Sequence, residues 1–412
     1  MRHIKRRTSK YATLLCIFDF LFYHMPKVRL NLSRSGEYNM LRFLDGGESH
    51  GRALMAIIEG IPSNFKLDMN FINNELFRRQ QGYGRGSRMK IEKDNVELWS
   101  GARGNTTTGN PITMVIFNRD YENWKDIMLS EPSEDEKIGV VRPGHGDLVG
   151  FLKYGTGDIR NTIERTSARE TAIRTAVGAL CKDMLRTLGI EIRSKVTSIG
   201  NIRDEEVDIF NDEVYDKIEH SEIRCYNEKI EEAIKLEIDK CSEAGDTIGG
   251  SILVSIKGVP LGIGSFTQWD RKLDALLSFA IMSVQGIKAI EFGNSLELYR
   301  RGSNFNDEIF YHEGKIVRHT NNAGGIEAGI SNGENINIKA FMKPIPTIRK
   351  PIHSIDIIKK TNVINRYERS DVCGVIPASI VLENVCAFEI LKEILNTFPS
   401  DDFNKLKQYL GK

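Results

Sequence analysis

The sequence lacks a charge excess of either sign. Its 57 Lys and Arg residues face 56 Asp and Glu residues, which leaves a net charge of +1 over 412 residues. A nucleic-acid-binding protein usually carries a basic excess, so this composition argues against that class and predicts no nucleic-acid partner. Any site for an anionic ligand must therefore be a local cluster of cationic side chains.

Long apolar runs and closely spaced cysteine pairs are also missing. No run approaches the roughly 20 residues of a membrane span, so no membrane partner is expected. The six cysteines have no C-x-x-C spacing and are scattered at Cys16, Cys181, Cys225, Cys241, Cys373 and Cys386. This pattern predicts reduced thiols in a cytoplasmic protein rather than a disulfide framework, and it predicts no metal site.

Familiar nucleotide and hydrolase motifs are incomplete. There is no G-x-G-x-x-G between a strand and a helix, which disfavours a Rossmann site, and no P-loop motif. Residues 47–51 read GESHG, which fits the nucleophile elbow of α/β-hydrolases with Ser49 as nucleophile, but no HGGG oxyanion-hole stretch accompanies it. His50 is the better candidate because imidazole exchanges a proton near neutral pH. The alternative for His50 is a structural histidine.

Residues 1–39 differ from the rest of the chain. Their basic start and apolar middle resemble a signal peptide, but Asp19 interrupts the apolar part and no small-x-small cleavage site follows. A transit peptide is another alternative, although serine is sparse. Gly36-Glu37 can be encoded by a ribosome-binding sequence at a normal spacing before the Met40 codon. We therefore expect residues 1–39 to be a non-native or disordered N-terminal extension.

Hydrophobic periodicity predicts an α+β fold, because strands and helices alternate irregularly and no repeat or linker is present. Residues 40–45 read as a strand, and 51–58 lead on from the turn that follows. Further strands are expected at 90–101, 110–120, 246–260, 287–293 and 334–345. Helices are expected at 68–80, 167–189, 270–284 and 377–395, with charge-rich surface helices within 204–244. The helix at 167–189 begins with a capping box, Ser167 to Glu170, and its many alanines predict close packing.

Two stretches combine glycine with basic residues. RRQQGYGRGSRMK (78–90) suits paired guanidinium contacts to a multiply anionic ligand, with a solvated basic loop and an RNA contact as alternatives. VRPGHGD (141–147) brings His145 near Arg142 and Asp147. A histidine so placed can protonate a phosphate leaving group, unless the stretch is a plain turn.

Four further stretches are candidate ligand contacts. Residues 165–167 lie at the expected start of the helix 167–189, where N–H groups and the helix dipole favour phosphate. The alternative is that Ser167 only caps the helix while Arg165 and Arg169 pair with acids. NNAGGIEAGISNG (321–333) allows backbone to approach a ligand closely, and KPIPT (343–347) follows it. RYERSDVCG (366–374) holds Arg369 and Asp371, for which a surface ion pair is the alternative.

In this order, the stretches resemble the chorismate synthase family. The matching motifs span nearly all of residues 40–412 and read GESHG, RRQQGYGRGSRM, RPGHGD, ERTSARET, GDTIGG, NNAGGIEAGISNG, KPIPT and RSDVCGVIP. The resemblance implies a single domain over 40–412, folded as a β-α-β sandwich with helices between antiparallel sheets. It also implies a homotetramer.

The resemblance implies a reaction as well. Members of the family are lyases that convert 5-enolpyruvylshikimate 3-phosphate to chorismate by 1,4-anti elimination of phosphate and a ring proton. This is the last common step of the shikimate pathway for aromatic amino-acid biosynthesis. They need reduced FMN although the reaction has no net redox change. Some members reduce FMN themselves with NADPH, and others rely on a separate flavin reductase. The sequence has no visible extra reductase domain, which favours a separate reductase for this protein.

The resemblance finally assigns residues by position. His145 protonates the departing phosphate, His50 keeps the reduced flavin in its proper protonation state, and Asp371 helps flavin N5 accept the substrate proton. The substrate-binding positions are Ser49, Arg79, Arg85, Arg88, Arg142, Arg169 and Arg369. The flavin-binding positions are Arg79, Arg85, Arg165, Thr166, Ser167, Gln285, Gly286, Ala328, Lys343, Pro344, Ile345, Pro346, Thr347 and Arg369. The chain departs from the family pattern at Gly146, where GHAD reads GHGD, and at Ala328, where a flavin-contact glycine is usual.

Overall fold

Two antiparallel sheets form the outer layers of the fold, in a computed structural model that describes residues 41–86, 91–296 and 299–412. The prediction for residues 1–39 lies outside this part of the chain. The first sheet has the order β1-β2-β6-β3, with β1 (Arg42–Gly46), β2 (Ala53–Glu59), β3 (Glu97–Leu98) and β6 (Ile112–Phe117). The second has the order β10-β15-β9-β7-β8, with β7 (Glu191–Ile199), β8 (Ile202–Arg203), β9 (Gly250–Lys257), β10 (Ile287–Phe292) and β15 (Ile336–Met342).

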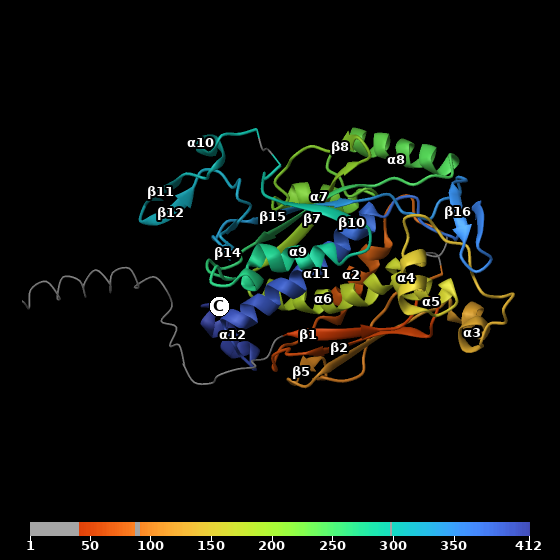
Figure 1. Cartoon of the computed structure of the whole chain (residues 1–412). Helices are drawn as coiled ribbons and strands as arrows, with labels where there is room; N and C mark the ends of the chain where they lie inside the picture. Colours follow the sequence, from red (N-terminus) through yellow and green to blue (C-terminus); the bar gives the residue numbers. More distant parts are fainter. Residues whose placement is uncertain (1–40, 87–90, 297–298) are drawn as a thin grey trace, which may run out of the picture.

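A layer of helices lies between the two sheets, as Figure 1 shows for α6 (Thr171–Thr187) and α11 (Val375–Thr397). Both helices are buried on nearly all sides, as expected for helices that are covered from above and below. They pack closely at Gly178, where a Cβ atom would lie 2.1 Å from the Asn384 carbonyl oxygen. Helices α2 (Met69–Gln80) and α9 (Leu273–Met282) pack beside them. This arrangement confirms the predicted β-α-β sandwich and the close packing of α6.

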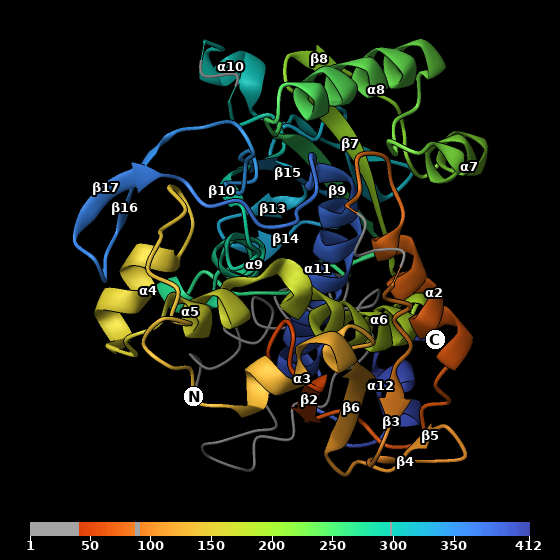
Figure 2. The ribbon, with the colours of Figure 1, turned by 90° about the vertical axis from the view of Figure 1, so that its right-hand side faces the viewer.

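Shorter elements surround this core (Figure 2). The helices are α3 (Tyr121–Leu129), α4 (Asp147–Tyr154), α5 (Ile159–Thr166), α7 (Asp212–His220), α8 (Glu228–Glu243), α10 (Gly302–Phe305) and α12 (Phe403–Tyr409), with 3-10 turns η2 (Ala168–Glu170) and η3 (Trp269–Arg271). Two-stranded pairs form between β4 (Ala102–Arg103) and β5 (Thr106–Thr107), β11 (Ile309–His312) and β12 (Lys315–Arg318), β13 (Ile326–Glu327) and β14 (Ile330–Ser331), and β16 (His353–Asp356) and β17 (Thr361–Ile364).

Most predicted elements are confirmed. The strand expected at residues 90–101 begins just outside the described residues, and within 91–101 it is wrong except at β3. The backbone of this stretch makes hydrogen bonds to side chains of α2 instead of to a neighbouring strand. Gln80 Nε2 donates to the Glu92 carbonyl, Gln80 Oε1 accepts from the Asp94 N–H, and Asn73 Oδ1 accepts from the Val96 N–H. Helices α3, α4 and α5 and strand β7 are not among the elements predicted from the sequence.

The capping box predicted at the start of the helix 167–189 is not formed. Ser167 Oγ accepts a hydrogen bond from the Arg169 N–H at 3.3 Å and caps the 3-10 turn η2. The Glu170 side chain accepts from Gln285 Nε2 at 2.9 Å and makes no cap hydrogen bond. Residues 165 and 166 end α5 rather than begin α6, whereas Ser167 lies between α5 and η2 and caps the start of η2.

Among the described residues, no helix combines the length and the apolar character that crossing a membrane requires. Even α11, which is apolar and long, carries acidic residues at Glu383, Glu389 and Glu393 that are buried inside the protein.

Candidate active site

A cavity of about 840 Å³ lies where loops from both sheets meet the first turns of α11. Its volume falls in the range typical of small-molecule sites. Residues that the sequence singles out from widely separated motifs line it together. They are Ser49, His50, Arg79, Arg85, Arg142, His145, Thr166, Ser167, Arg169, Gln285, Gly286, Lys343, Pro344, Ile345, Pro346, Thr347, Arg369 and Asp371.

Three predicted positions are not in this lining. Arg88 lies outside the described residues. Arg165 turns to the end of β1, where its Nη2 is 2.9 Å from Asp45 Oδ2, and its Nη1 donates to the carbonyl of Gly47 in the following loop at 3.3 Å. Ala328 lies in the exposed turn between β13 and β14 with a φ of 52°, so it does not border the cavity within one chain.

Cationic side chains outnumber acids around the cavity. The cations are Arg79, Arg85, Arg142, Arg169, Lys288, Lys343 and Arg369, whereas the acids are Asp120, Glu368 and Asp371. The chain as a whole is nearly neutral. This is therefore the local cluster that a nearly neutral protein needs to bind a multiply anionic ligand.

Arg79 and Arg169 are neighbours because both bind Asp94. Arg79 Nη1 is 3.4 Å from Asp94 Oδ2, and Arg169 Nη1 is 2.7 Å from Asp94 Oδ1. Thr171 Oγ1 also accepts from Arg79 Nη2 at 2.9 Å. Burial, opposed by Asp94 but reinforced by the charges of Arg169 and Arg85, lowers the pKa of Arg79 to about 10. The side chain stays charged at neutral pH, and a bound anion would relieve the crowding of cations.

Two buried polar atoms at the cavity have no hydrogen-bond partner among the described residues, namely Arg169 Nη2 and Gln285 Oε1. Arg169 Nη2 is 3.7 Å from Glu92 Oε2 in an ion pair, and Gln285 Nε2 donates to Glu170 Oε2 at 2.9 Å. Buried polar groups are nearly always paired. Both atoms are therefore positions where a ligand can complete the hydrogen bonding.

His50 is held by Glu164 and packs on Trp124. Its Nδ1 is 2.9 Å from Glu164 Oε1, and its backbone N–H donates to Oε2 at 2.7 Å. Because a carboxylate only accepts, we assign the hydrogen to Nδ1. Burial raises the pKa of Glu164, but the hydrogen bond and charge of His50 outweigh it and hold that pKa below its ordinary value. The neighbouring Ser49 donates to Ser167 Oγ at 3.0 Å.

His145 has a matching carboxylate partner in Asp147, which is completely buried at the start of α4. Its Nδ1 is 2.7 Å from Asp147 Oδ1, which again assigns the hydrogen to Nδ1 and leaves Nε2 as the proton-exchanging nitrogen. Arg142 clamps the same carboxylate, with Nε 2.8 Å from Oδ2. Burial raises the pKa of Asp147, but the hydrogen bonds from Arg142 and His145 outweigh it and hold that pKa well below the ordinary range.

Arg369 and Asp371 reach the cavity but do not pair with each other, so the surface-pair alternative is wrong. Asp371 Oδ2 is 2.7 Å from Arg85 Nη1, and Oδ1 accepts from the Gly86 N–H at 2.6 Å. Arg369 Nη2 is 3.3 Å from Asp120 Oδ2. The Asp371 contacts join the segment before α11 to the glycine-rich bend after α2, and the Arg369 contact joins it to the start of α3.

The KPIPT segment forms another wall of the cavity. Lys343 Nζ donates to the Gly144 carbonyl at 2.6 Å, which ties this segment to RPGHGD. Burial and the charge of Lys288 lower the pKa of Lys343. Apolar groups interrupt the charges and offer a surface to a planar ring, and they include Trp124, Val284, Met342, Pro344, Ile345 and Pro346.

Several residues of the site were missed by sequence reasoning. Glu164 lies in the ERTSARET motif, directly before the flavin-binding positions Arg165, Thr166 and Ser167. This neighbourhood could have identified Glu164 as a residue of the site. Asp94 and Trp124 belong to stretches without a distinctive motif, and only the fold brings them to the site. Within the described residues, no group of His, Cys, Asp and Glu side chains could hold a metal ion.

Comparisons with known proteins agree on one family. A family model described as chorismate synthase matches residues 41–395. A chorismate synthase of Clostridium tetani (strain Massachusetts / E88) is 64% identical over 374 residues, covering 91% of this chain and 97% of that protein. One of Alkaliphilus oremlandii (strain OhILAs) is 52% identical, covering 89% and 97%. A crystal structure of chorismate synthase superposes with a TM-score of 0.71 at 38% identity, covering 92% of this chain and 97% of the other.

Proposed function

The chain belongs to the chorismate synthase family and catalyses the phosphate-eliminating step that forms chorismate, and on that premise we propose how its cavity performs this reaction. The substrate, 5-enolpyruvylshikimate 3-phosphate, carries two carboxylates and a phosphate. We assign these anionic groups to the cationic lining, with Ser49 as a further contact. The substrate-binding arginines are Arg79, Arg85, Arg142, Arg169 and Arg369, together with Arg88 outside the described residues. The excess of cations over acids in the cavity is the observation that carries this assignment.

The family implies reduced FMN, and the residues of the cavity fit this group. The volume is at the upper end for a single small ligand, Gln285 Oε1 is buried without a partner among the described residues, and the KPIPT wall offers apolar surface. When bound, reduced FMN supplies reducing equivalents that are returned within each turnover. The residues proposed to hold it are Arg79, Arg85, Thr166, Ser167, Gln285, Gly286, Arg369 and the segment Lys343–Thr347. Arg165 and Ala328 also match flavin-binding positions of the family, but they do not line the cavity of the single chain.

Three side chains are proposed to manage protons. His145 gives the proton on Nε2 to the departing phosphate, because Asp147 fixes the hydrogen on Nδ1. His50, held by Glu164, maintains the protonation state of the bound cofactor. Asp371, oriented by Arg85 and the Gly86 N–H, assists removal of the ring proton.

An anaerobic assay tests the proposed function. Purified protein is mixed with 5-enolpyruvylshikimate 3-phosphate and dithionite-reduced FMN, and chorismate is followed by absorbance. We expect product only with reduced flavin. Formation of chorismate without flavin, or no chorismate from folded protein that binds FMN, would contradict the proposal. Replacing dithionite with NADPH in the same assay tests self-reduction; we expect none, since a separate flavin reductase is the proposed source.

The remaining properties follow from the family and from the surface. A homotetramer is supported by apolar side chains exposed on the outer face of the first sheet, which include Leu44, Met55 and Ile57. The described cysteines form no disulfide, which suits the reducing cytoplasm. Sedimentation of the purified protein tests the tetramer directly.

A further inference from the structure

The two histidine–carboxylate pairs of the active site are joined by one further acid, Glu368. On one side, Glu368 Oε2 is 3.2 Å from Arg142 Nη1, and Arg142 holds Asp147, the partner of His145. On the other side, Glu368 Oε1 is 3.4 Å from Arg160 Nη2. The two sides meet at a single carboxylate that lies one residue before Arg369.

The second arm leads from Arg160 to His50. Arg160 Nη1 is 3.3 Å from Glu164 Oε1, the atom that also binds His50 Nδ1. The Arg160 guanidinium packs 4.9 Å from the centre of the Trp124 ring, which contacts the His50 imidazole at 4.0 Å. Charges of opposite sign therefore alternate from one histidine to the other, with Glu368 in the middle.

Glu368 is built to remain ionised in this place. Its side chain is 23% exposed and is faced by Arg142, Arg160 and Arg366. Burial raises the pKa of Glu368, but the charges of these arginines outweigh burial and hold that pKa below its ordinary value. Without the carboxylate, Arg142 and Arg160 would face each other as like charges in a partly buried place.

We propose that Glu368 is a positioning residue that fixes His50 and His145 relative to each other through Arg160 and Arg142. The inference rests on the proposed roles of these histidines. Glu368 also lines the cavity, but the proposed effect passes through Glu164 and Asp147, the carboxylates that orient the two imidazoles. Small displacements of reacting groups are costly to catalysis, so a shared anchor for two proton-handling groups has a direct kinetic consequence.

The test compares Glu368→Gln with Glu219→Gln. Glu219 is a matched control because its side chain is 24% exposed and also bridges two arginines, Arg78 and Arg224, away from the cavity. The amide of Glu368→Gln keeps the shape but presents an N–H group to one arginine. In the anaerobic assay we expect kcat to fall about tenfold in Glu368→Gln with KM within about threefold of native. Glu219→Gln should remain within about twofold of native in both constants.

The second readout does not depend on activity. Solid-state nitrogen NMR of protein labelled only at its eight histidines reports ring protonation and tautomer, with His50→Gln and His145→Gln assigning the signals. We expect the Nδ1 signals of both histidines to move in Glu368→Gln and neither to move in Glu219→Gln. A native signal from either histidine, or native kcat, in folded Glu368→Gln overturns the proposal. If the unmutated protein forms no chorismate, that result contradicts the proposed function. The nitrogen spectra of Glu368→Gln would then still test whether Glu368 positions the two histidines.

A second variant applies if Glu368→Gln does not fold. Arg160→Lys keeps the charge but cannot bind Glu164 and Glu368 with two separate nitrogens. It should move the His50 signal and leave the His145 signal in place. An unmoved His50 signal, or a His145 signal that moves alone, contradicts the proposed order of contacts.

Discussion

Two adjacent residues of α2, Arg78 and Arg79, belong to two charge clusters that are built differently. Arg79 lies in the cavity cluster, where cations outnumber acids. Arg78 lies in a second cluster between α2, α6, α7 and α11, which we call the closed cluster. Its cations are Arg78, Lys182 and Arg224, and its acids are Glu75, Glu219 and Glu383.

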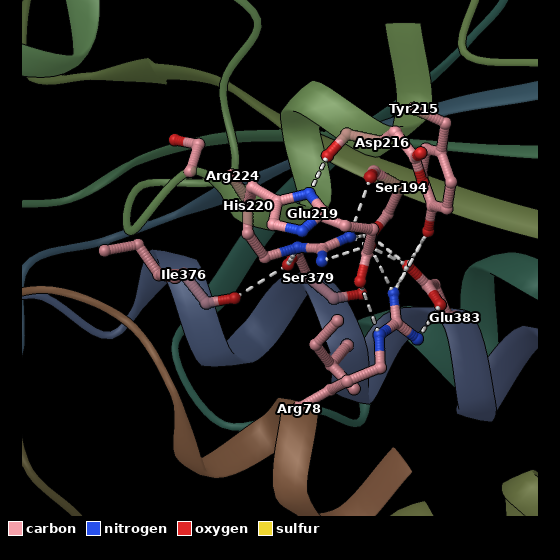
Figure 3. A network of polar contacts seen from close by, with 12 residues as sticks. Arg78, Ser194, Tyr215, Asp216, Glu219, His220, Arg224, Ile376, Ser379 and Glu383 are labelled. Carbon is pink, nitrogen blue, oxygen red and sulfur yellow. Dashed lines mark hydrogen bonds and ion pairs between the residues drawn. The ribbon is translucent and has the colours of Figure 1, made fainter. Parts of the chain in front are cut away.

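The closed cluster satisfies its charges within the protein. Figure 3 shows Arg78, Arg224 and Glu219 converging near Glu383, whose side chain is 0% exposed. Arg78 Nη1 is 2.9 Å from Glu383 and 2.6 Å from Glu75, and its Nη2 is 2.7 Å from Glu219. Cations and acids are equal in number, so no charge remains for a ligand.

The comparison teaches that an arginine-rich motif does not by itself show which arginine binds a ligand. Both clusters are buried and both use Arg–carboxylate contacts. They differ in what the cations face. In the closed cluster, acids match the cations in number and the charges face one another inside the protein, so we expect mutations to reduce stability. Along the cavity, the arginines also have acid partners, but the cationic side chains of the lining outnumber its acids and border an open space, so we expect mutations to reduce activity.

The largest contrast is expected from matched lysine variants. Lys182→Met removes a partner of Glu75 and Glu383 in the closed cluster, so the free energy of unfolding should fall by about 3 kcal/mol. Lys343→Met removes a cation of the cavity lining that is proposed to hold FMN, so stability should change by less than about 1 kcal/mol while KM for reduced FMN rises. Urea unfolding and steady-state kinetics measure both. Equal loss of stability in the two variants would remove the distinction between the clusters.

The next effect concerns the proton-handling groups of the cavity. His145→Ala and Asp371→Ala should each lower kcat about 10²-fold or more, which is the scale of a lost general acid or base. His50→Ala should lose a similar factor, with a changed pH profile. Stopped anaerobic assays give kcat, and thermal unfolding checks that each variant folds. Near-native turnover in any of the three would exclude that residue from the mechanism.

The sequence predicted the central helices and the motifs of the cavity, but it did not predict which arginines belong to which charge cluster. Helices α6 and α11 were predicted from apolar periodicity. The structure brings the motifs with His50, His145 and Asp371 to one cavity, and the roles of these residues stay predictions. The separation of Arg78 from Arg79 was not predictable, because two of the Arg78 partners, Glu219 and Glu383, lie more than a hundred positions away in the sequence. Likewise, the sequence pattern of residues 91–101 is typical of a strand, and it does not show that side chains of α2 bind this backbone.

A third prediction uses pH. Burial raises the pKa values of Glu75, Glu219 and Glu383, but the cluster's cations outweigh burial and hold all three below the ordinary value. The unfolded chain therefore binds more protons in acid, so this stabilisation is complete above about pH 5 and is lost as the pH falls toward the folded pKa values. Glu383→Gln should flatten the fall in unfolding free energy between about pH 5 and about pH 3. Parallel pH profiles of native and variant protein would contradict this.

The smallest effect is expected outside both clusters, at Ala328. Its φ of 52° is unfavourable for a residue with a side chain, and glycine adopts it without strain. Ala328→Gly should raise the free energy of unfolding by about 1 kcal/mol, as measured by urea titration. KM for the substrate should not change, because Ala328 does not line the cavity of its own chain. A loss of stability would show that the methyl group has a contact that the single chain does not contain.

The adjacent arginines test the central claim most directly. Arg78→Lys and Arg79→Lys make the same chemical change at neighbouring positions, and each variant is measured by urea unfolding and by the anaerobic assay. Arg79→Lys should raise KM for 5-enolpyruvylshikimate 3-phosphate at least about tenfold, because one lysine cannot replace a guanidinium between Asp94, Thr171 and an anion. Arg78→Lys should lower the unfolding free energy by about 2 kcal/mol or more and leave kcat and KM within about twofold of native. Equal losses of activity in the two variants would contradict the division into a closed cluster and a ligand-binding one.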